Sequence, residues 1–599
     1  MDRSSIAAAP AVARVPRLAD HSADTRMLLL AGMALVVGTG GAASAWLLLH
    51  LIAIVTNLAW FGRFSVEPAL IIDSTLGVAA LLIPIVGSVI IGLMARFGSD
   101  KIRGHGIPEA IEAILYGQSK LSSKVAILKP LSSAISIGTG GPFGAEGPII
   151  MTGGAIGSIF AQRFRLTAAE RKTLLVAGAA AGMTGIFGTP IAAILLALEV
   201  LLFEWKPRSF VPVVVAVLTA LAWRPYLVGE GPLFPFDASF AIDTTTLVLA
   251  ALTGLLTGFV AAGLSSALYR IEDGFHALPV HWMWWPALGA VVVGIGGVIE
   301  PRVLGAGYNS IQDLLDGSLA LKAMLLLLAV KAVVWLVALG SGTSGGILAP
   351  LLIIGGAFGG LIGLMLPGGP GPWAMIGMTG VMAAAMRAPL TAALFAVELT
   401  GHFDALPATA ATAGAAYAVA VLILKRSILT EKISRRGRHI LQEYSVDPLA
   451  IAQADQIMTP APETLAEDMP IVDAIRFFEQ AQHRSYPVID AQGLPIAIAS
   501  RADALRWRQT NLAEGVTLGE LLSDGSMPVV HPATPATDIA NLMIAEDMGR
   551  ICVVDPQSGA LIGIIARRNL LSARAGKLRE ERERGAHETR LAWKRGEKK

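Results

Sequence analysis

The chain has 599 residues, of which 54% are hydrophobic and 15% charged, and its mean hydropathy is +0.62. This composition excludes a soluble globular protein of this size and indicates a polytopic membrane protein. The net charge of +2 gives no reason to expect a nucleic-acid partner, and the one cysteine, Cys552, excludes an intrachain disulfide.

The first apolar run extends from Met27 to Trp60 and is too long for the core of a cleaved signal peptide. We expect one long, tilted membrane helix there, preceded by a cytoplasmic segment at 1–26. Further apolar stretches recur to about Leu424, and many of them, such as 173–204 and 373–399, are interrupted by glycine or proline. Such stretches predict broken helices around a site at mid-membrane depth.

An internal repeat divides this apolar region into two halves. Pro148–Gly157 (Pro-Ile-Ile-Met-Thr-Gly-Gly-Ala-Ile-Gly) matches Pro350–Gly359, which lies 202 residues later. Pro190–Glu199 matches Pro389–Glu398, which lies 199 residues later. Two ordered matches at nearly one spacing are hard to obtain from apolar composition alone, so they predict two homologous halves related by a pseudo-two-fold axis.

The composition changes after Leu424. Six basic residues between Lys425 and Arg438 crowd the exit from the last apolar stretch, which places this end in the cytoplasm by the positive-inside rule. The region 454–572 is α/β in pattern and repeats a helix, a strand ending in aspartate, a turn and a second strand. The expected organisation is a membrane domain at 27–440 with repeats at about 75–225 and 285–425, a linker at 441–453, α/β halves at 454–510 and 517–572, and a charged tail at 573–599.

Three glycine-rich segments each precede a proline that opens an apolar helix: Gly104-His-Gly-Ile-Pro-Glu109, Gly144-Ala-Glu-Gly-Pro148 and Gly345-Gly-Ile-Leu-Ala-Pro350. Glycine lets backbone N–H groups approach a ligand, and a helix N-terminus favours an anion. Together the three segments could converge three helix N-termini on one anion. Glu146 lies within the second, and an ionisable residue at membrane depth is a functional candidate.

In content and order, these segments resemble the CLC family of chloride channels and proton-coupled chloride antiporters, over about residues 27–440. The two α/β halves resemble a CBS domain pair, which is also common at the C-terminus of that family. The resemblance implies an all-α membrane domain of two inverted repeats with broken helices, a cytoplasmic α/β CBS pair, and a homodimer with a separate anion path in each subunit. It also implies a bacterial-type inner or plasma membrane location, cytoplasmic termini, no enzyme activity, and chloride or a similar small anion as the partner.

The resemblance assigns roles to individual residues. Glu146 matches the family's gating glutamate, whose ionised carboxylate occupies the anion's own site and swings away when it is protonated. The alternative is a helix-terminal carboxylate that only complements the helix dipole, worth about 0.3–1 kcal/mol. The other anion-binding positions are Gly104, His105, Gly106, Ile107, Gly144, Ala145, Gly147, Gly346, Ile347, Leu348 and Leu429.

Three of these positions depart from the family pattern. His105 stands where most members have serine, and Leu429 stands where they usually have tyrosine, so both usual hydroxyl donors are absent. Leu348 replaces the usual phenylalanine. Either anion binding at the central site is weak or His105 supplies the missing donor, and a loop histidine pointing away from the path is the alternative.

Val200 stands where the family's antiporters usually carry a second, proton-transferring glutamate, and family channels tend to have valine there. This favours an anion channel regulated by the CBS pair, with a proton-coupled chloride antiporter as the alternative and Glu204 as a substitute proton carrier. Glu199 and its equivalent Glu398 occur in the two halves and are interpreted as packing or interface carboxylates. A CBS-regulated divalent-cation transporter is a more distant alternative, disfavoured because few carboxylates surround the glycine segments.

In the CBS pair, Ser500-Arg-Ala-Asp503 matches the pattern at which such modules hold the ribose of adenine nucleotides. The corresponding Ala566-Arg-Arg-Asn569 lacks both the hydroxyl and the carboxylate. At most one nucleotide site is expected, at Ser500 and Asp503, and a structural pair without a ligand is the alternative. No cofactor is required for transport.

Overall fold

The structure, a computed structural model, describes residues 25–237, 243–438, 449, 452–510, 515–522 and 527–574. These residues form two compact units, one containing the described residues up to 438 and the other containing those from 449 onward. Nearly all of the predicted N-terminal segment, most of the linker and nearly all of the charged tail lie outside the described residues.

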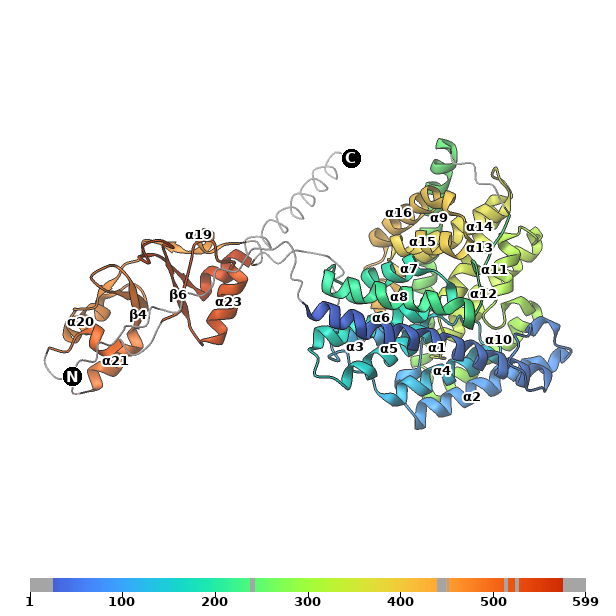
Figure 1. Ribbon diagram of the computed structural model, residues 1–599. Helices are drawn as coiled ribbons and strands as arrows, with labels where there is room; N and C mark the ends of the chain where they lie inside the picture. Colours follow the sequence, from blue (N-terminus) through green and yellow to red (C-terminus); the bar gives the residue numbers. More distant parts are fainter. Residues whose placement is uncertain are drawn as a thin grey trace, which may run out of the picture. The chain divides into compact units, whose positions relative to one another are not determined.

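In the first unit, each helix of the first half has a counterpart in the second half, in the same order (Figure 1). The first half comprises α1 (Arg26–Phe61), α2 (Leu82–Phe97), α3 (Ile107–Leu115), α4 (Ser123–Gly138), α5 (Glu146–Gln162), α6 (Ala168–Phe187), α7 (Pro190–Leu196) and α8 (Pro207–Leu227). The second half comprises α9 (Thr244–His276), α10 (Trp285–Ile299), α11 (Tyr308–Leu315), α12 (Leu321–Gly340), α13 (Leu348–Gly363), α14 (Pro370–Met386), α15 (Pro389–Thr400) and α16 (Leu406–Ile423), and α17 (Ile428–Arg435) follows.

The structural repeat includes a long first helix in each half. Helix α1 packs against α6 and α8, and α9 packs against α14 and α16 in the same way. The repeats of the structure therefore begin at α1 and α9, earlier than the predicted bounds of about 75–225 and 285–425. The long helix that the run from Met27 to Trp60 predicts is confirmed. Among the described residues, seven helical segments are long and apolar enough to cross a membrane.

Two predicted apolar stretches are each divided into two helices. The stretch 173–204 contains α6 and α7, and the stretch 373–399 contains α14 and α15. The chain turns through a left-handed residue at each break, Gly188 at φ 68° and Arg387 at φ 56°. Pro190 and Pro389 then open the next helix, where proline's missing N–H costs no hydrogen bond.

The repeated Gly-Gly-Ala-x-Gly pattern lets helix backbones touch. A Cβ atom on either Gly153 or Gly178 would overlap the carbonyl oxygen of the other, which brings α5 directly against α6. Gly355 and Gly377 have the same relationship between α13 and α14. Small residues at membrane helix interfaces allow this close approach, so these glycines hold each half together by packing.

The second unit holds two α/β halves, each around a small apolar core. The first half comprises α19 (Ala454–Ile457), β1 (Thr459–Pro460), β2 (Leu465–Ala466), α20 (Ile471–Gln480), β3 (Ser485–Ile489), β4 (Pro495–Ser500) and α21 (Arg501–Gln509). The second comprises α22 (Leu518–Leu522), β5 (Val529–Val530), α23 (Ala536–Ala545), β6 (Arg550–Val554) and β7 (Leu561–Ala566). One sheet has the order β2-β3-β4 and the other has the order β1-β7-β6-β5. Strand β1 of the first half therefore pairs with β7 and belongs to the sheet of the second half.

Candidate functional site

The structure brings the three glycine-rich segments into direct contact. Gly144 N–H donates to the carbonyl oxygen of Gly346 at 3.2 Å, and Gly346 N–H donates back to Gly144 at 2.9 Å. Gly345 N–H donates to the carbonyl oxygen of Gly104 at 3.4 Å. A Cβ atom on Gly147 would overlap the carbonyl oxygen of His105, so this position accepts only glycine without a shift of the backbone.

Three helices begin at this junction. Helices α3, α5 and α13 start at Ile107, Glu146 and Leu348. Each start lies one or two residues before the proline that was predicted to open the helix. A proline in the first turn is tolerated because the first N–H groups of a helix have no partner within it. Glu146 and Leu348 are each the first residue of their helix, so the carboxylate of one half is matched by an apolar side chain in the other.

The Glu146 side chain is completely buried, and neither carboxylate oxygen has a hydrogen-bond partner among the described residues. The carboxylate lies against the paired loops, where a Cβ atom on Gly144 or Gly346 would overlap it. Its electrostatic neighbours are the N–H groups of Glu146 and Ala349 and the ammonium group of Lys331. The Glu146 carboxyl group therefore lies beside the start of α13, and a helix N-terminus favours an anion.

Comparison with known proteins agrees with this geometry. Residues 86–421 match the family model described as "Voltage gated chloride channel", and residues 454–509 and 519–576 match the CBS domain model. The chain belongs to the voltage-gated chloride channel (CLC) family. It is an integral membrane protein of that transport family and carries a C-terminal CBS pair.

The CLC chain is similar to curated bacterial relatives and to solved structures, with sequence identities from 20% to 30%. It is 30% identical over 338 residues to the "Voltage-gated ClC-type chloride channel ClcB" of Escherichia coli O81 (strain ED1a), and equally to that of strain CFT073, covering 55% of this chain and 80% of theirs. A slow cyanobacterial Cl⁻/H⁺ antiporter matches with a TM-score of 0.59 and 24% identity, covering 69% of this chain and 99% of that one. A eukaryotic CLC transporter matches at 0.58 and 20%, covering 91% and 99%, and a CLC-type fluoride/proton antiporter at 0.59 and 20%, covering 68% and 98%.

Two buried lysines that bind carbonyl oxygens of loops in this CLC domain were not among the predicted site residues. Lys129 of α4 donates to the carbonyl oxygens of Ile102 and Gly104 at 2.8 and 2.7 Å. Lys331 of α12 donates to those of Val303 and Gly305 at 2.8 and 3.4 Å. Both side chains are completely buried, and the two lysines are 202 residues apart, the spacing of the proline match. This shared spacing could have identified the two lysines as equivalent positions of the repeat from the sequence alone.

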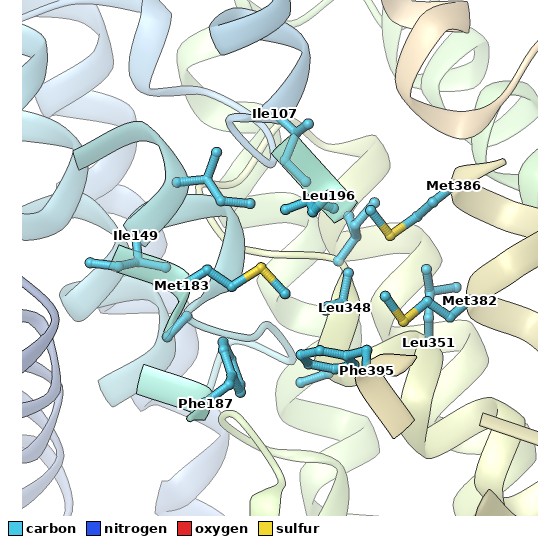
Figure 2. Close-up of a cluster of buried hydrophobic side chains, with 14 of the residues drawn as sticks. Ile107, Ile149, Met183, Phe187, Leu196, Leu348, Leu351, Met382, Met386 and Phe395 are labelled. Atoms are coloured by element: carbon cyan, nitrogen blue, oxygen red, sulfur yellow. The ribbon is translucent and has the colours of Figure 1, made fainter. Parts of the chain in front are cut away.

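An apolar cluster lies at the junction of the two halves. Figure 2 shows Phe187, Leu348 and Phe395 pointing toward one another, and the rings of Phe187 and Phe395 are 5.5 Å apart. The ring of Tyr308, the first residue of α11, meets the edge of Phe187 at 6.4 Å. The Tyr308 hydroxyl is buried and makes no hydrogen bond of good geometry among the described residues, and its electrostatic neighbours are Glu146 and the Ala145 N–H group. Tyr308 was not among the predicted site residues.

His105 is 3% exposed, and its Nδ1 atom has no hydrogen-bond partner among the described residues. It lines a cavity of about 550 Å³ that we call the basic vestibule. The charged residues of its wall are Asp100, Arg103, Glu272, Lys432, Arg435 and Arg436, and Gly104, His105 and Tyr269 also line it. Leu429 is completely buried in the first turn of α17 and offers no polar atom to this cavity. The structure thus places His105 on the vestibule wall and keeps Leu429 within the protein core.

Val200 is buried in the π-helical segment Ala197–Leu202 that continues α7. Glu204 lies beyond the turn that follows this segment and is held by ion pairs of 3.1 Å to Lys172 and to Lys206. Its carboxylate also accepts a hydrogen bond of 2.8 Å from Ser209. Because these three partners bind the Glu204 carboxylate, its presence is explained by local stabilisation, without a role in proton transfer.

Glu199 and Glu398 each bind the other half of the protein. Glu398 accepts the N–H groups of Ile191 and Ala192 at 2.9 and 2.8 Å, at the start of α7. Glu199 accepts those of Leu390 and Thr391 at 3.2 and 2.8 Å, at the start of α15. The interpretation of both as interface carboxylates is confirmed, because each caps a helix N-terminus across the interface.

In the CBS pair, Ser500 and Asp503 cap α21. The Ser500 hydroxyl accepts the Asp503 N–H at 3.2 Å, and the Asp503 carboxylate accepts the Ser500 N–H at 2.9 Å. Asn569 takes the corresponding place in the second half, where its side chain accepts the Ala566 N–H at 3.0 Å. Helix capping alone is a sufficient reason for these residue types.

Proposed function

We propose that the chain exchanges chloride, or a similar small anion, for protons along a path gated by Glu146. The observation that carries this proposal is the buried Glu146 carboxyl group, which lies beside the N–H groups of Glu146 and Ala349 where α5 and α13 begin. An ionised carboxylate there competes with a free anion for the same N–H groups. A protonated one loses its charge and leaves that place to the anion, so movement of one proton and of the anion are linked at one residue.

A channel is the second candidate, and it was the first preference from sequence because of Val200. The buried, apolar setting of Val200 and the similarity to ClcB, which is described as a chloride channel, favour it. Two of the similar structures are of proton-coupled antiporters, and the Glu146 geometry fits a cycle in which carboxylate and anion alternate. We therefore place exchange first.

Simultaneous recording of chloride and proton flux from liposomes tests the proposal. For the wild-type chain, we expect an outward chloride gradient to drive protons inward in the absence of a proton gradient. Glu146→Gln should still pass chloride but move no protons and lose pH dependence, whereas Glu67→Gln, a change at an exposed carboxylate, should behave as wild type. Chloride flux without proton movement in the wild-type chain would establish the channel instead, and unchanged coupling in Glu146→Gln would remove Glu146 from the gate.

The finer features that the family resemblance implies belong to the same proposal. These are a homodimer with one path per subunit, a bacterial inner membrane location and cytoplasmic termini. We also propose that the CBS pair regulates transport through one adenine-nucleotide site at Ser500 and Asp503. Because both side chains already cap α21, a bound ribose has to share the Asp503 carboxylate. Titration of the full chain with ATP, ADP and AMP should show binding that Asp503→Ala abolishes, and equal binding by that variant would contradict the site.

A further inference from the structure

The chain has His105 and Leu429 at the two positions where the family resemblance implies hydroxyl donors. One ammonium group, that of Lys432, lies close to His105 in the basic vestibule. Lys432 follows Leu429 by three residues on α17, so both side chains lie on the same face of the helix. A Cβ atom on Gly104 would overlap the Lys432 Nζ atom, which places this cation directly against the first glycine-rich segment. His105, the next residue of that segment, lines the same cavity.

Other polar groups near this place are already engaged. The Tyr269 hydroxyl donates to the carbonyl oxygen of Ile428 at 2.5 Å. The three N–H donors of Lys129 are matched by three acceptors, two carbonyl oxygens and the Ser344 hydroxyl at 3.0 Å. The Tyr269 hydroxyl and the Lys129 ammonium group therefore have no free donor for an anion that enters the vestibule.

Two arginines of the vestibule, Arg435 and Arg436, are also tied to neighbours. The Arg435 guanidinium lies 4.8 Å from the centre of the Tyr269 ring and pairs with Asp273. Arg436 pairs with Glu109 at 3.1 Å and with Glu112 at 2.6 Å. Both arginines contribute to the positive field of the vestibule, but their donors point at fixed partners.

In the part of the chain that the structure describes, three groups on the vestibule wall have free donor capacity. One is the buried, unpartnered Nε atom of Arg103, which lies against Gly342. The other two lie beside Gly104. Among the described residues, the Lys432 ammonium has one ion-pair partner, the Glu109 Oε1 atom at 3.0 Å, so two of its three N–H donors have no protein acceptor. The His105 ring is nine-tenths or more buried and has an unpartnered Nδ1 atom. Both groups face the same cavity beside Gly104.

We propose that Lys432 and His105 together bind the transported anion at the floor of the basic vestibule, in place of the two missing hydroxyl groups. This inference rests on the proposed function and names the ligands of one step in it. The ligand class is a small inorganic anion, and the main contact is a charge-assisted hydrogen bond from the ammonium group, which is stronger than one from a neutral hydroxyl. Glu109 acts as a positioning residue because its carboxylate holds the ammonium at the Gly104 loop.

Chloride titration of the purified full chain by calorimetry tests this assignment. Lys432→Met should weaken chloride binding by about tenfold or more, while Lys432→Arg should stay within about threefold of wild type. The matched control is Arg435→Gln, which removes the same charge from the same cavity but from a group tied to Tyr269 and Asp273. It should weaken binding by less than about threefold because it acts only through the screened field.

A second variant moves affinity in the opposite direction, which a folding defect cannot imitate. Glu109→Gln frees the Lys432 ammonium from its carboxylate and should strengthen chloride binding. Equal losses in Lys432→Met and Arg435→Gln, or weaker binding in Glu109→Gln, would overturn the assignment and leave only a general vestibule field. Normal coupled flux in the wild-type chain combined with such a result would refute this inference alone, whereas no anion flux in the wild-type chain would refute the proposed function.

Discussion

Lys129 and Lys331 are buried at equivalent places in the two repeats, and each ties down the loop that leads into a short helix. The loops start at Ile102 and Val303, and their first glycines, Gly104 and Gly305, both have positive φ angles, 78° and 66°. An ammonium group offers several donors to the carbonyl oxygens of such a turn. The pair therefore fixes the backbone on which α3 and α11 begin.

We expect Lys331→Met to lower the free energy of unfolding by about 2 kcal/mol or more, because two buried carbonyl oxygens lose their donor. The matched control is Lys322→Met on the same helix, where the side chain is exposed and the change should stay within about 0.5 kcal/mol. Thermal unfolding of the detergent-purified chains measures the difference. Equal melting temperatures for the two variants would show that the buried ammonium does not hold the loop.

Two tyrosines give a second matched comparison. The Tyr308 hydroxyl is buried without a partner among the described residues, whereas the Tyr269 hydroxyl donates to Ile428 at 2.5 Å. Tyr308→Phe should therefore raise the unfolding free energy by about 1 kcal/mol, because it removes an unpaired polar group, and Tyr269→Phe should lower it by a similar amount. The same unfolding measurement on both variants is the check, and a loss of stability in Tyr308→Phe would mean that its hydroxyl has a partner in solution.

The parts of the site that could be predicted from sequence are those set by local backbone chemistry. The three glycine-rich segments were recognisable because glycine before a helix-opening proline has few other uses. The repeat predicted that Glu146 and Leu348 take equivalent places, and both begin a helix. The repeated glycines could be recognised as a sequence pattern. Their close contacts, such as that between Gly153 and Gly178, could be identified only from the packing of the helices.

What could not be predicted depends on distant segments. Lys432 is 328 residues from Gly104 in sequence, and a basic residue beside the last helix has a sufficient explanation in membrane orientation. The short helix α11 has no apolar run to predict it, so Tyr308 remained hidden with it. The partners of Glu199 and Glu398 lie about 190 to 210 residues away, and only the fold brings them together.

Cys552 provides a test of the second unit. It lies on β6 between β5 and β7, is completely buried, and burial raises the pKa of its thiol to about 12. Since the thiolate is the reactive form, we expect no maleimide labelling of the folded chain at neutral pH and complete labelling in denaturant. The control variant Ser558→Cys places a thiol in an exposed turn after the same strand and should label at once.

The pH dependence of that labelling follows from the raised pKa. The unfolded chain ionises this thiol near the ordinary cysteine pKa of about 8.5, while the folded chain does not, so the unit loses stability as the pH rises above that value. Labelling of Cys552 should therefore begin in alkaline solution through opening of the fold, and helical signal in the second unit should fall with it. Rapid labelling at neutral pH in a chain that keeps its fold would show that β6 is not covered as the structure has it.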